Sequence, residues 1–334
     1  MNADNLLNMS EPDFILFAND FDGKGGGNPL VGDDIQKKLR AKDLAWVHMD
    51  ATNPNTEAWL SENLDYLDPI IIDALLASET RPRVTFFERG AMVILKGMNL
   101  QENADPEDMI SIRLWIDDHR IISLQRRSLM AVNDIREAMA QGEGPKSAAD
   151  FLARLCQRLF ERMQPTLFDI TDQIDEIEEQ LLDTNLSKAM RHEVNDIRRK
   201  TLIFKRYLTP QRDVMQSLRA SDLSWIKSSH NRIFQENQDR LTRYLEDLDA
   251  LRERAQIIKE EYVTMMSDKL NRNTYALSLI AGVFLPLGFL TGLFGINVGG
   301  MPGTENPMGF WIIVGLCVAS GVGFLGLFKL LKWL

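Results

Sequence analysis

Two long stretches near the C-terminus of this chain contain no acidic or basic residue. They cover residues 273–304 and 306–328, and only Glu305 separates them. A helix needs about 20 predominantly apolar residues to cross the hydrocarbon core of a bilayer. Soluble cores rarely supply two uncharged runs of this length in succession, so the pattern predicts two transmembrane helices, at 275–295 and 308–328.

Basic residues flank this pair of predicted spans. Lys269 and Arg272 precede the first span and Lys329 and Lys332 follow the second, whereas the connecting loop, 297–307, has no basic residue. Positively charged flanks tend to stay on the cytoplasmic side of a membrane. The N-terminal residues also lack the basic and apolar regions of a signal peptide. We therefore expect a multi-pass membrane protein whose N- and C-termini are both cytoplasmic.

Residues 1–146 alternate strand-like and helix-like patterns. Residues 83–100 and 109–125 each look like a β-hairpin, and in the second Ile112, Leu114 and Ile116 alternate with polar residues before an Asp-Asp turn. We expect an α+β cytoplasmic domain built as α/β/α layers. Further strands are predicted at 14–18 and 44–50, and helices at 56–64, 69–77 and 128–140.

From residue 147 onward the pattern changes to long helices. Apolar residues at three- and four-residue spacing predict a helical hairpin region, 147–230, with a turn near Asn185. Within it, Thr209 and Pro210 are typical of the N-cap and first residue of a new helix. A stalk helix, 231–273, is predicted to continue into the first transmembrane helix, and the two membrane helices occupy 274–334.

The stalk carries a heptad seam with two interpretations. It packs either against the chain's own hairpin or against other copies of the chain. The seam consists of Leu241, Tyr244, Leu248, Leu251, Ala255, Ile258, Tyr262 and Met265.

Composition narrows the range of functions. The chain has 48 acidic and 38 basic residues, a formal charge of −10, so nucleic acid is not an expected partner. Its two cysteines, Cys156 and Cys317, and four histidines show no zinc-ligand spacing, so a metal would be handled through oxygen. The glycine-rich run at 22–29 lacks the phosphate-loop pattern and indicates a flexible loop. We find no catalytic constellation and expect neither an enzyme nor a bound cofactor.

The first arm of the predicted hairpin is acidic. It is either a solvated helix face or a carboxylate surface that concentrates or senses divalent cations through its negative potential. The acidic residues are Asp169, Asp172, Asp175, Glu176, Glu178, Glu179 and Asp183.

The first span carries a stripe of mostly small or polar residues. The stripe is either a close helix-packing face or the lining of a narrow aqueous path, which a single two-span chain cannot enclose. At the mouth of such a path, the Asn297 amide oxygen would accept hydrogen bonds from the water of a hydrated cation. The stripe consists of Asn271, Thr274, Ser278, Ala281, Leu285, Gly288 and Gly292.

The segment FLPLGFLTGLFGINVGGMP, 284–302, closes the first of two C-terminal spans after an α+β domain and a stalk. With ETRPRV at 79–84 and the terminal lysines, it resembles the CorA superfamily of metal ion transporters, whose signature is Gly-Met-Asn. The resemblance implies a CorA-like funnel and a homopentamer with a central pore. It also implies that Pro286 matches the proline of the pore helix and that Gly295, Ile296 and Asn297 form the cation filter.

Two departures point to the zinc-transporting branch of that superfamily. Ile296 replaces the signature methionine, and the loop after Asn297 lacks the acidic segment of the magnesium branch. Glu305 remains to attract cations outside the membrane in a salt-dependent way. We therefore expect proton-coupled Zn²⁺ uptake across the cell inner membrane. The alternatives are zinc efflux, a CorA-like channel for Mg²⁺, Co²⁺ or Ni²⁺, and a membrane-tethered scaffold that binds partners.

Overall fold

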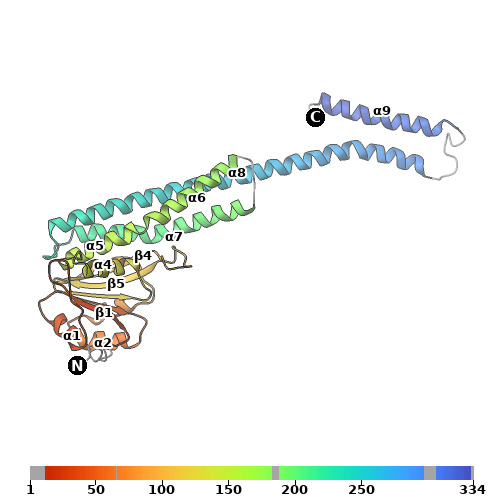
Figure 1. Cartoon of the computed structure of the whole chain (residues 1–334). Coiled ribbons are helices and arrows are strands. Elements are labelled where there is room, and N and C mark those ends of the chain that lie inside the picture. Colours follow the sequence, from red (N-terminus) through yellow and green to blue (C-terminus); the bar gives the residue numbers. More distant parts are fainter. Residues whose placement is uncertain (1–11, 65, 183–187, 297–305, 332–334) are drawn as a thin grey trace. The chain divides into compact units, whose positions relative to one another are not determined.

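The structure is a computed structural model that describes residues 12–64, 66–182, 188–296 and 306–331. The chain forms two compact units, Met1–Ile258 and Lys259–Leu334. The first unit contains a six-stranded sheet in the order β1-β2-β6-β5-β4-β3 (Figure 1). Its strands are β1 (Ile15–Asp20), β2 (Ala45–Asp50), β3 (Arg83–Phe86), β4 (Gly90–Gly97), β5 (Ile110–Asp117) and β6 (Arg120–Gln125).

The sheet is antiparallel except where β2 pairs with β6 in parallel. The β3–β4 and β5–β6 pairs confirm the two predicted hairpins, and β1 and β2 confirm the two further strands. The short helices of the first unit are α1 (Asp33–Arg40), α2 (Asn55–Asn63), α3 (Pro69–Leu76), α4 (Met130–Ala140) and α5 (Ala148–Glu161).

Side chains alternate between the two faces of the sheet and create two apolar layers. On one face, Val47 and Ile94 belong to a core cluster that includes Leu60 and Leu75 of the helices α2 and α3. On the other face, the Trp46 ring packs edge-on against the Phe151 ring of α5, with ring centroids 4.7 Å apart. Helices therefore cover both faces, which confirms the predicted α/β/α layering.

Three longer helices follow. They are α6 (Gln164–Leu182), α7 (Lys188–Arg219) and α8 (Ser228–Gly295), and the predicted turn near Asn185 lies outside the described residues. The seam of α8 is buried at each position from Leu241 to Ile258 within the first unit. This favours packing against the chain's own hairpin over that length. Tyr262 and Met265 are only half-buried.

The predicted helix start at Thr209–Pro210 is wrong. Pro210 lies inside the continuous helix α7. A proline removes one backbone hydrogen bond of a helix, but Leu208 before it and Met215 after it are both fully buried. The Gln211 side chain also accepts a hydrogen bond of 2.9 Å from the backbone N–H of Lys96. Tertiary packing on both sides therefore outweighs the lost hydrogen bond.

The glycine-rich run at 22–29 is organised around an aspartate. One carboxylate oxygen of Asp22 accepts backbone N–H groups from Lys24, Gly25 and Gly26 at 2.7 to 2.9 Å. These hydrogen bonds lower the pKa of Asp22. Successive N–H groups of this kind form an anion-binding nest. Here the chain's own carboxylate fills the nest, in agreement with the absence of a phosphate-loop pattern.

His48 is buried in the second apolar layer. Its Nδ1 lies 2.7 Å from the Ser123 hydroxyl, which also accepts the Trp46 indole N–H at 2.7 Å. Its Nε2 is buried and has no hydrogen-bond partner among the described residues. Burial lowers the pKa of His48 to about 4. The folded domain therefore holds this imidazole in its neutral form.

Acid should destabilise the protein through His48. The unfolded chain protonates this side chain below its ordinary pKa of 6.5, whereas the folded domain resists protonation down to about pH 4. The free energy of unfolding should fall between these pH values by on the order of 3 kcal/mol. His48→Asn, which keeps an acceptor for Ser123 and does not titrate, should flatten this part of the profile. The free energy of unfolding is measured by denaturant titration at several pH values between 4 and 7. His192→Asn, on the exposed side of α7, is the control and should leave the profile unchanged.

Candidate ion-conduction site

Two helices of the described residues are long and apolar enough to cross a membrane. They are α8 and α9 (Gly309–Leu330), and their most apolar windows have mean hydropathies of 2.1 and 2.2. The predicted spans, 275–295 and 308–328, fall within or beside these helices, and Pro286 lies inside α8. Sequence and structure agree on two membrane helices at the C-terminus.

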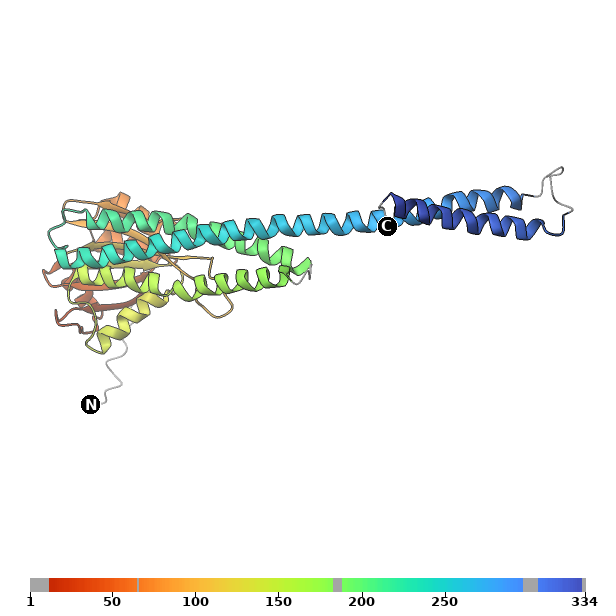
Figure 2. The ribbon, with the colours of Figure 1, turned by 90° about the horizontal axis from the view of Figure 1, so that it is seen from above.

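In the second unit, α9 turns back and runs antiparallel to the C-terminal part of α8 (Figures 1 and 2). A Cβ atom added at Gly282 would lie 3.0 Å from Cζ of Phe328, and one at Gly321 would lie 3.9 Å from Cδ1 of Leu287. The two helices therefore meet at these glycines through the side chains of Phe328 and Leu287. Leu279, Gly282, Pro286 and Leu290, at helical spacing, are half-buried on this side of α8.

Most of the predicted stripe lies on a different side of α8, although Ser278 lines an apolar pocket with Gly282 and Phe328. Gly288 and Gly292 have no atom of the described residues within 4 Å of an added Cβ, and Leu285 is 72% exposed. Asn271, Thr274 and Ser278 are also exposed, and Ala281 is half-buried. The Ser278 hydroxyl donates to the carbonyl oxygen of Thr274 at 2.9 Å, along the helix. A single chain thus leaves most of the stripe uncovered, and its role as a pore lining stays a prediction.

Only part of the predicted filter can be placed. Gly295 is the last residue of α8, and Ile296, which follows it, is 48% exposed. Asn297 and Glu305 lie outside the described residues. The filter assignment and the attraction of cations by Glu305 therefore remain predictions.

The acidic arm forms α6. Asp169, Asp172, Glu176 and Glu179 are exposed, whereas Arg254 of α8 binds Asp175 and Glu178 and has a raised pKa because of these two carboxylates, Glu178 first. Among the described residues, no group of three or more His, Cys, Asp or Glu side chains is arranged to hold a metal ion. Part of the acidic surface thus serves the packing of α6 on α8. Attraction of cations by the remainder stays a prediction, and Asp183 lies outside the described residues.

The fold and the paired spans define a membrane protein with a large α+β domain and two C-terminal membrane helices. Residues 41–330 match the family described as CorA-like Mg²⁺ transporter protein. The chain therefore belongs to the CorA-like transporter family. This confirms the resemblance and the prediction that the chain is not an enzyme.

Two relatives are similar over nearly their whole length. The chain is 36% identical over 319 residues to the zinc transport protein ZntB of Pectobacterium atrosepticum, covering 96% of each. It is also 36% identical over 324 residues to the divalent cation transporter CmaX of Pseudomonas aeruginosa, covering 96% of this chain and 97% of CmaX.

Solved structures agree with the fold. The structure of full-length CmaX matches with a TM-score of 0.83 at 35% identity, covering 97% of this chain and all of CmaX (100%). The CorA magnesium transporter from Methanocaldococcus jannaschii matches with a TM-score of 0.77 over 95% of this chain and 98% of that one. At 17% identity, this second match concerns the fold alone.

Proposed function

We propose that this protein carries Zn²⁺ across the cell inner membrane through the central pore of a homopentamer, as proton-coupled uptake. The observation that carries the proposal is the uncovered stripe on α8, which runs from Asn271 to Gly292 and leads to Gly295 and Ile296. Small and polar side chains leave room for water beside the helix. One chain with two spans cannot enclose a path, so the stripe requires other copies of the chain around a common axis.

Asn297 and Glu305 complete the proposed outer mouth of this pore. A ring of asparagine amides would bind the water shell of a cation, so the cation would not have to lose its bound water to enter. Glu305 would raise the local cation concentration. The basic residues beside the spans support an orientation with both termini in the cytoplasm. Transport in this scheme requires no bound cofactor.

The choice of Zn²⁺ rests on the similarity to ZntB and on Ile296 in place of the signature methionine. Hydrated Zn²⁺ and Mg²⁺ have the same charge and similar size, so a ring of amide oxygens alone would separate them poorly. Selectivity would then come from Ile296, from the loop after it, or from sites deeper in the pore. The second candidate is a channel for Mg²⁺, Co²⁺ or Ni²⁺, and the match to the family described as CorA-like Mg²⁺ transporter protein supports it.

Proton coupling needs a group that changes protonation as the metal passes. Neither predicted span contains an acidic, basic or histidine side chain. The proposed carriers therefore lie at the ends of the path, at Glu305 outside and at Asp268 inside, or the proton follows a file of water. Uptake, as opposed to efflux, is likewise part of this proposal.

Flux in liposomes tests the proposal. Vesicles containing the protein and a zinc-sensitive dye should fill faster when a proton gradient points in the direction of zinc entry, at clamped voltage. Zinc flux should exceed magnesium flux measured with a magnesium dye under the same gradients. Flux that ignores the gradient and is faster for Mg²⁺ would establish the channel instead. If neither metal is transported, both transport hypotheses are wrong and the membrane-tethered scaffold is the remaining one.

A further inference from the structure

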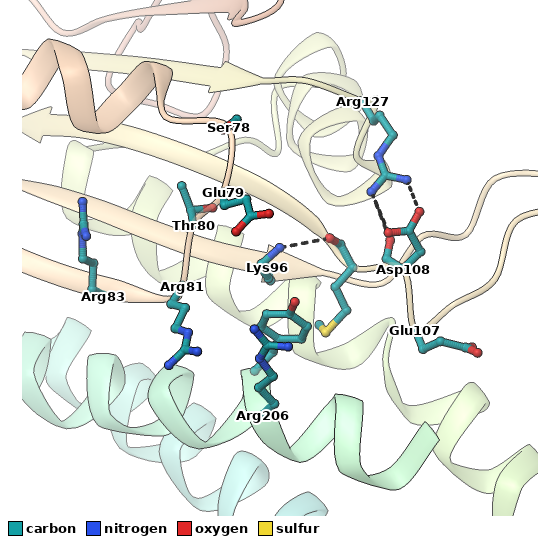
Figure 3. Close-up of a pocket in the computed structure, with 12 residues that line it drawn as sticks. Ser78, Glu79, Thr80, Arg81, Arg83, Lys96, Glu107, Asp108, Arg127 and Arg206 are labelled. Carbon is teal, nitrogen blue, oxygen red and sulfur yellow. Dashed lines mark hydrogen bonds and ion pairs between the residues drawn. The ribbon is translucent and has the colours of Figure 1, made fainter. Parts of the chain in front are cut away.

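A polar pocket of about 600 Å³ opens at the edge of the sheet (Figure 3). The pairing of β3 with β4 begins at Arg83 and Ile94, so the last residues of β4 have no strand beside them at this edge. The chain segment before β3, the segment before β5 and the helix α7 surround this part of β4. Five basic residues and three acidic residues line the pocket, and the basic ones are Arg81, Arg83, Lys96, Arg127 and Arg206.

Two of the three carboxylates that line the pocket already form ion pairs with arginines. Arg127 binds Asp108 through both of its terminal nitrogens, and this contact lowers the pKa of Asp108. Arg199, which does not line the pocket, binds Glu107 at 2.6 Å. The third carboxylate, Glu79, is exposed and makes no ion pair within 4 Å among the described residues. The pocket therefore keeps an excess of positive charge, although the chain as a whole carries −10.

Lys96 places one of these charges in the interior of the pocket. It is 8% exposed, its ammonium group donates to the carbonyl oxygen of Met109 at 3.2 Å, and it lies 4.6 Å from the centre of the Tyr207 ring. No carboxylate of the described residues lies within ion-pair distance of it. Burial, with Arg113 as the next cause, lowers the pKa of Lys96 to about 8. The lysine is therefore still largely protonated at neutral pH.

A second buried cation lies near enough to Lys96 to lower its pKa but does not line the pocket. Arg113 of β5 is 1% exposed, and its Nη2 donates to the carbonyl oxygen of Ala77 at 2.9 Å. Its Nε and Nη1 have no hydrogen-bond partner among the described residues. Buried charges are normally paired, since an unpaired charge costs several kcal/mol in folding. Neither Lys96 nor Arg113 has a carboxylate partner among the described residues, and Lys96 lines the pocket, which points to a ligand that supplies negative charge there.

We propose that this pocket binds a soluble anion that carries a phosphate group, with Lys96, Arg81 and Arg206 as its donors. Guanidinium groups bind phosphate oxygens through paired hydrogen bonds, and a lysine ammonium adds a point charge. A divalent cation is repelled by the same lining, so the pocket is not a second site for the transported metal. Its volume lies in the range of small-molecule sites, which spans about 300–1,000 Å³. It therefore accommodates either inorganic phosphate or a phosphate with a nucleoside attached.

Binding to the full-length protein in detergent tests this site. Inorganic phosphate and adenosine monophosphate are titrated separately by calorimetry at an ionic strength held constant with chloride. Both should bind saturably and raise the midpoint of thermal unfolding. Lys96→Met and Arg206→Gln should each weaken binding by about tenfold or more, since each removes a charged hydrogen-bond donor. Tighter binding of the nucleotide would identify an organic phosphate as the ligand, and equal binding would identify the phosphate group alone.

Arg212→Gln is the matched control. Arg212 lies on the same helix as Arg206, pairs with Asp213, and does not line the pocket. It should bind both anions like the wild type. Equal binding by the wild type, Arg206→Gln and Arg212→Gln, or no heat beyond the chloride control, would refute the site. Arg206 is exposed, so its variant should fold even if Lys96→Met does not. Zinc flux does not enter this test, so its outcome is separate from that of the transport proposal.

Discussion

Replacing Asn297 by alanine should lower zinc flux into liposomes by more than about tenfold, since each copy in the ring loses a hydrogen-bond acceptor for the hydrated cation. The assembly should survive, because a substitution in a connecting loop opens no cavity in the apolar core. Flux with the zinc dye and the mass of the detergent-solubilised complex should be measured on the same preparation. The expected result is a complex of unchanged size that transports little zinc.

Asn306→Ala is the matched control for Asn297→Ala. Asn306 lies near the end of the same predicted loop, and its side-chain oxygen accepts the backbone N–H of Met308 at 3.0 Å ahead of α9. Its loss should affect the start of α9 slightly and leave flux near the wild-type rate. If Asn297→Ala transports as fast as Asn306→Ala, then Asn297 is only a turn residue and the proposed filter is wrong.

Strong periodicity explains which parts of the fold the sequence predicted. Ile112, Leu114 and Ile116 recur at every second position before an Asp-Asp turn, so the hairpin of 110–117 and 120–125 was evident. The uncharged runs were long enough to identify both membrane helices. The helix α1 was missed, because only Ile35 and Leu39 of its eight residues are buried and one helical pair is a weak signal. The start at Pro210 was predicted wrongly because the packing that carries α7 through the proline comes from distant residues.

The candidate site shows the same limit. Helical spacing predicted the stripe on α8, but the side that α9 covers depends on contacts such as Gly282 with Phe328, which no local pattern encodes. The basic pocket was missed for a similar reason. Arg81 and Arg83 stood in a segment noted only for family resemblance, and Lys96 was a lone charge in the apolar strand GAMVILKG. A lone lysine within a buried strand was the available signal, but only the fold brings it beside Arg206.

A phenylalanine at Gly288 should reduce zinc flux to the level of protein-free vesicles. Within the part of the chain that the structure describes, no atom lies within 4 Å of a Cβ at Gly288, so a single chain accommodates the ring and should fold normally. In the proposed homopentamer, symmetry repeats this ring around the axis and fills the narrow aqueous path. The reconstituted variant should therefore lose zinc flux and keep the wild-type midpoint of thermal unfolding.

Two other glycines give matched controls for this substitution. Gly323→Phe places the same ring on α9, where no described atom lies within 4 Å of an added Cβ, and it should transport zinc, because the proposed stripe lies on α8. Gly282→Phe should instead lower the unfolding midpoint, because its Cβ would already lie 3.0 Å from Phe328. If Gly288→Phe transports zinc at the rate of Gly323→Phe, the stripe does not line the path. In that case the small residues of α8 serve helix packing, and the conduction pathway lies elsewhere in the assembly.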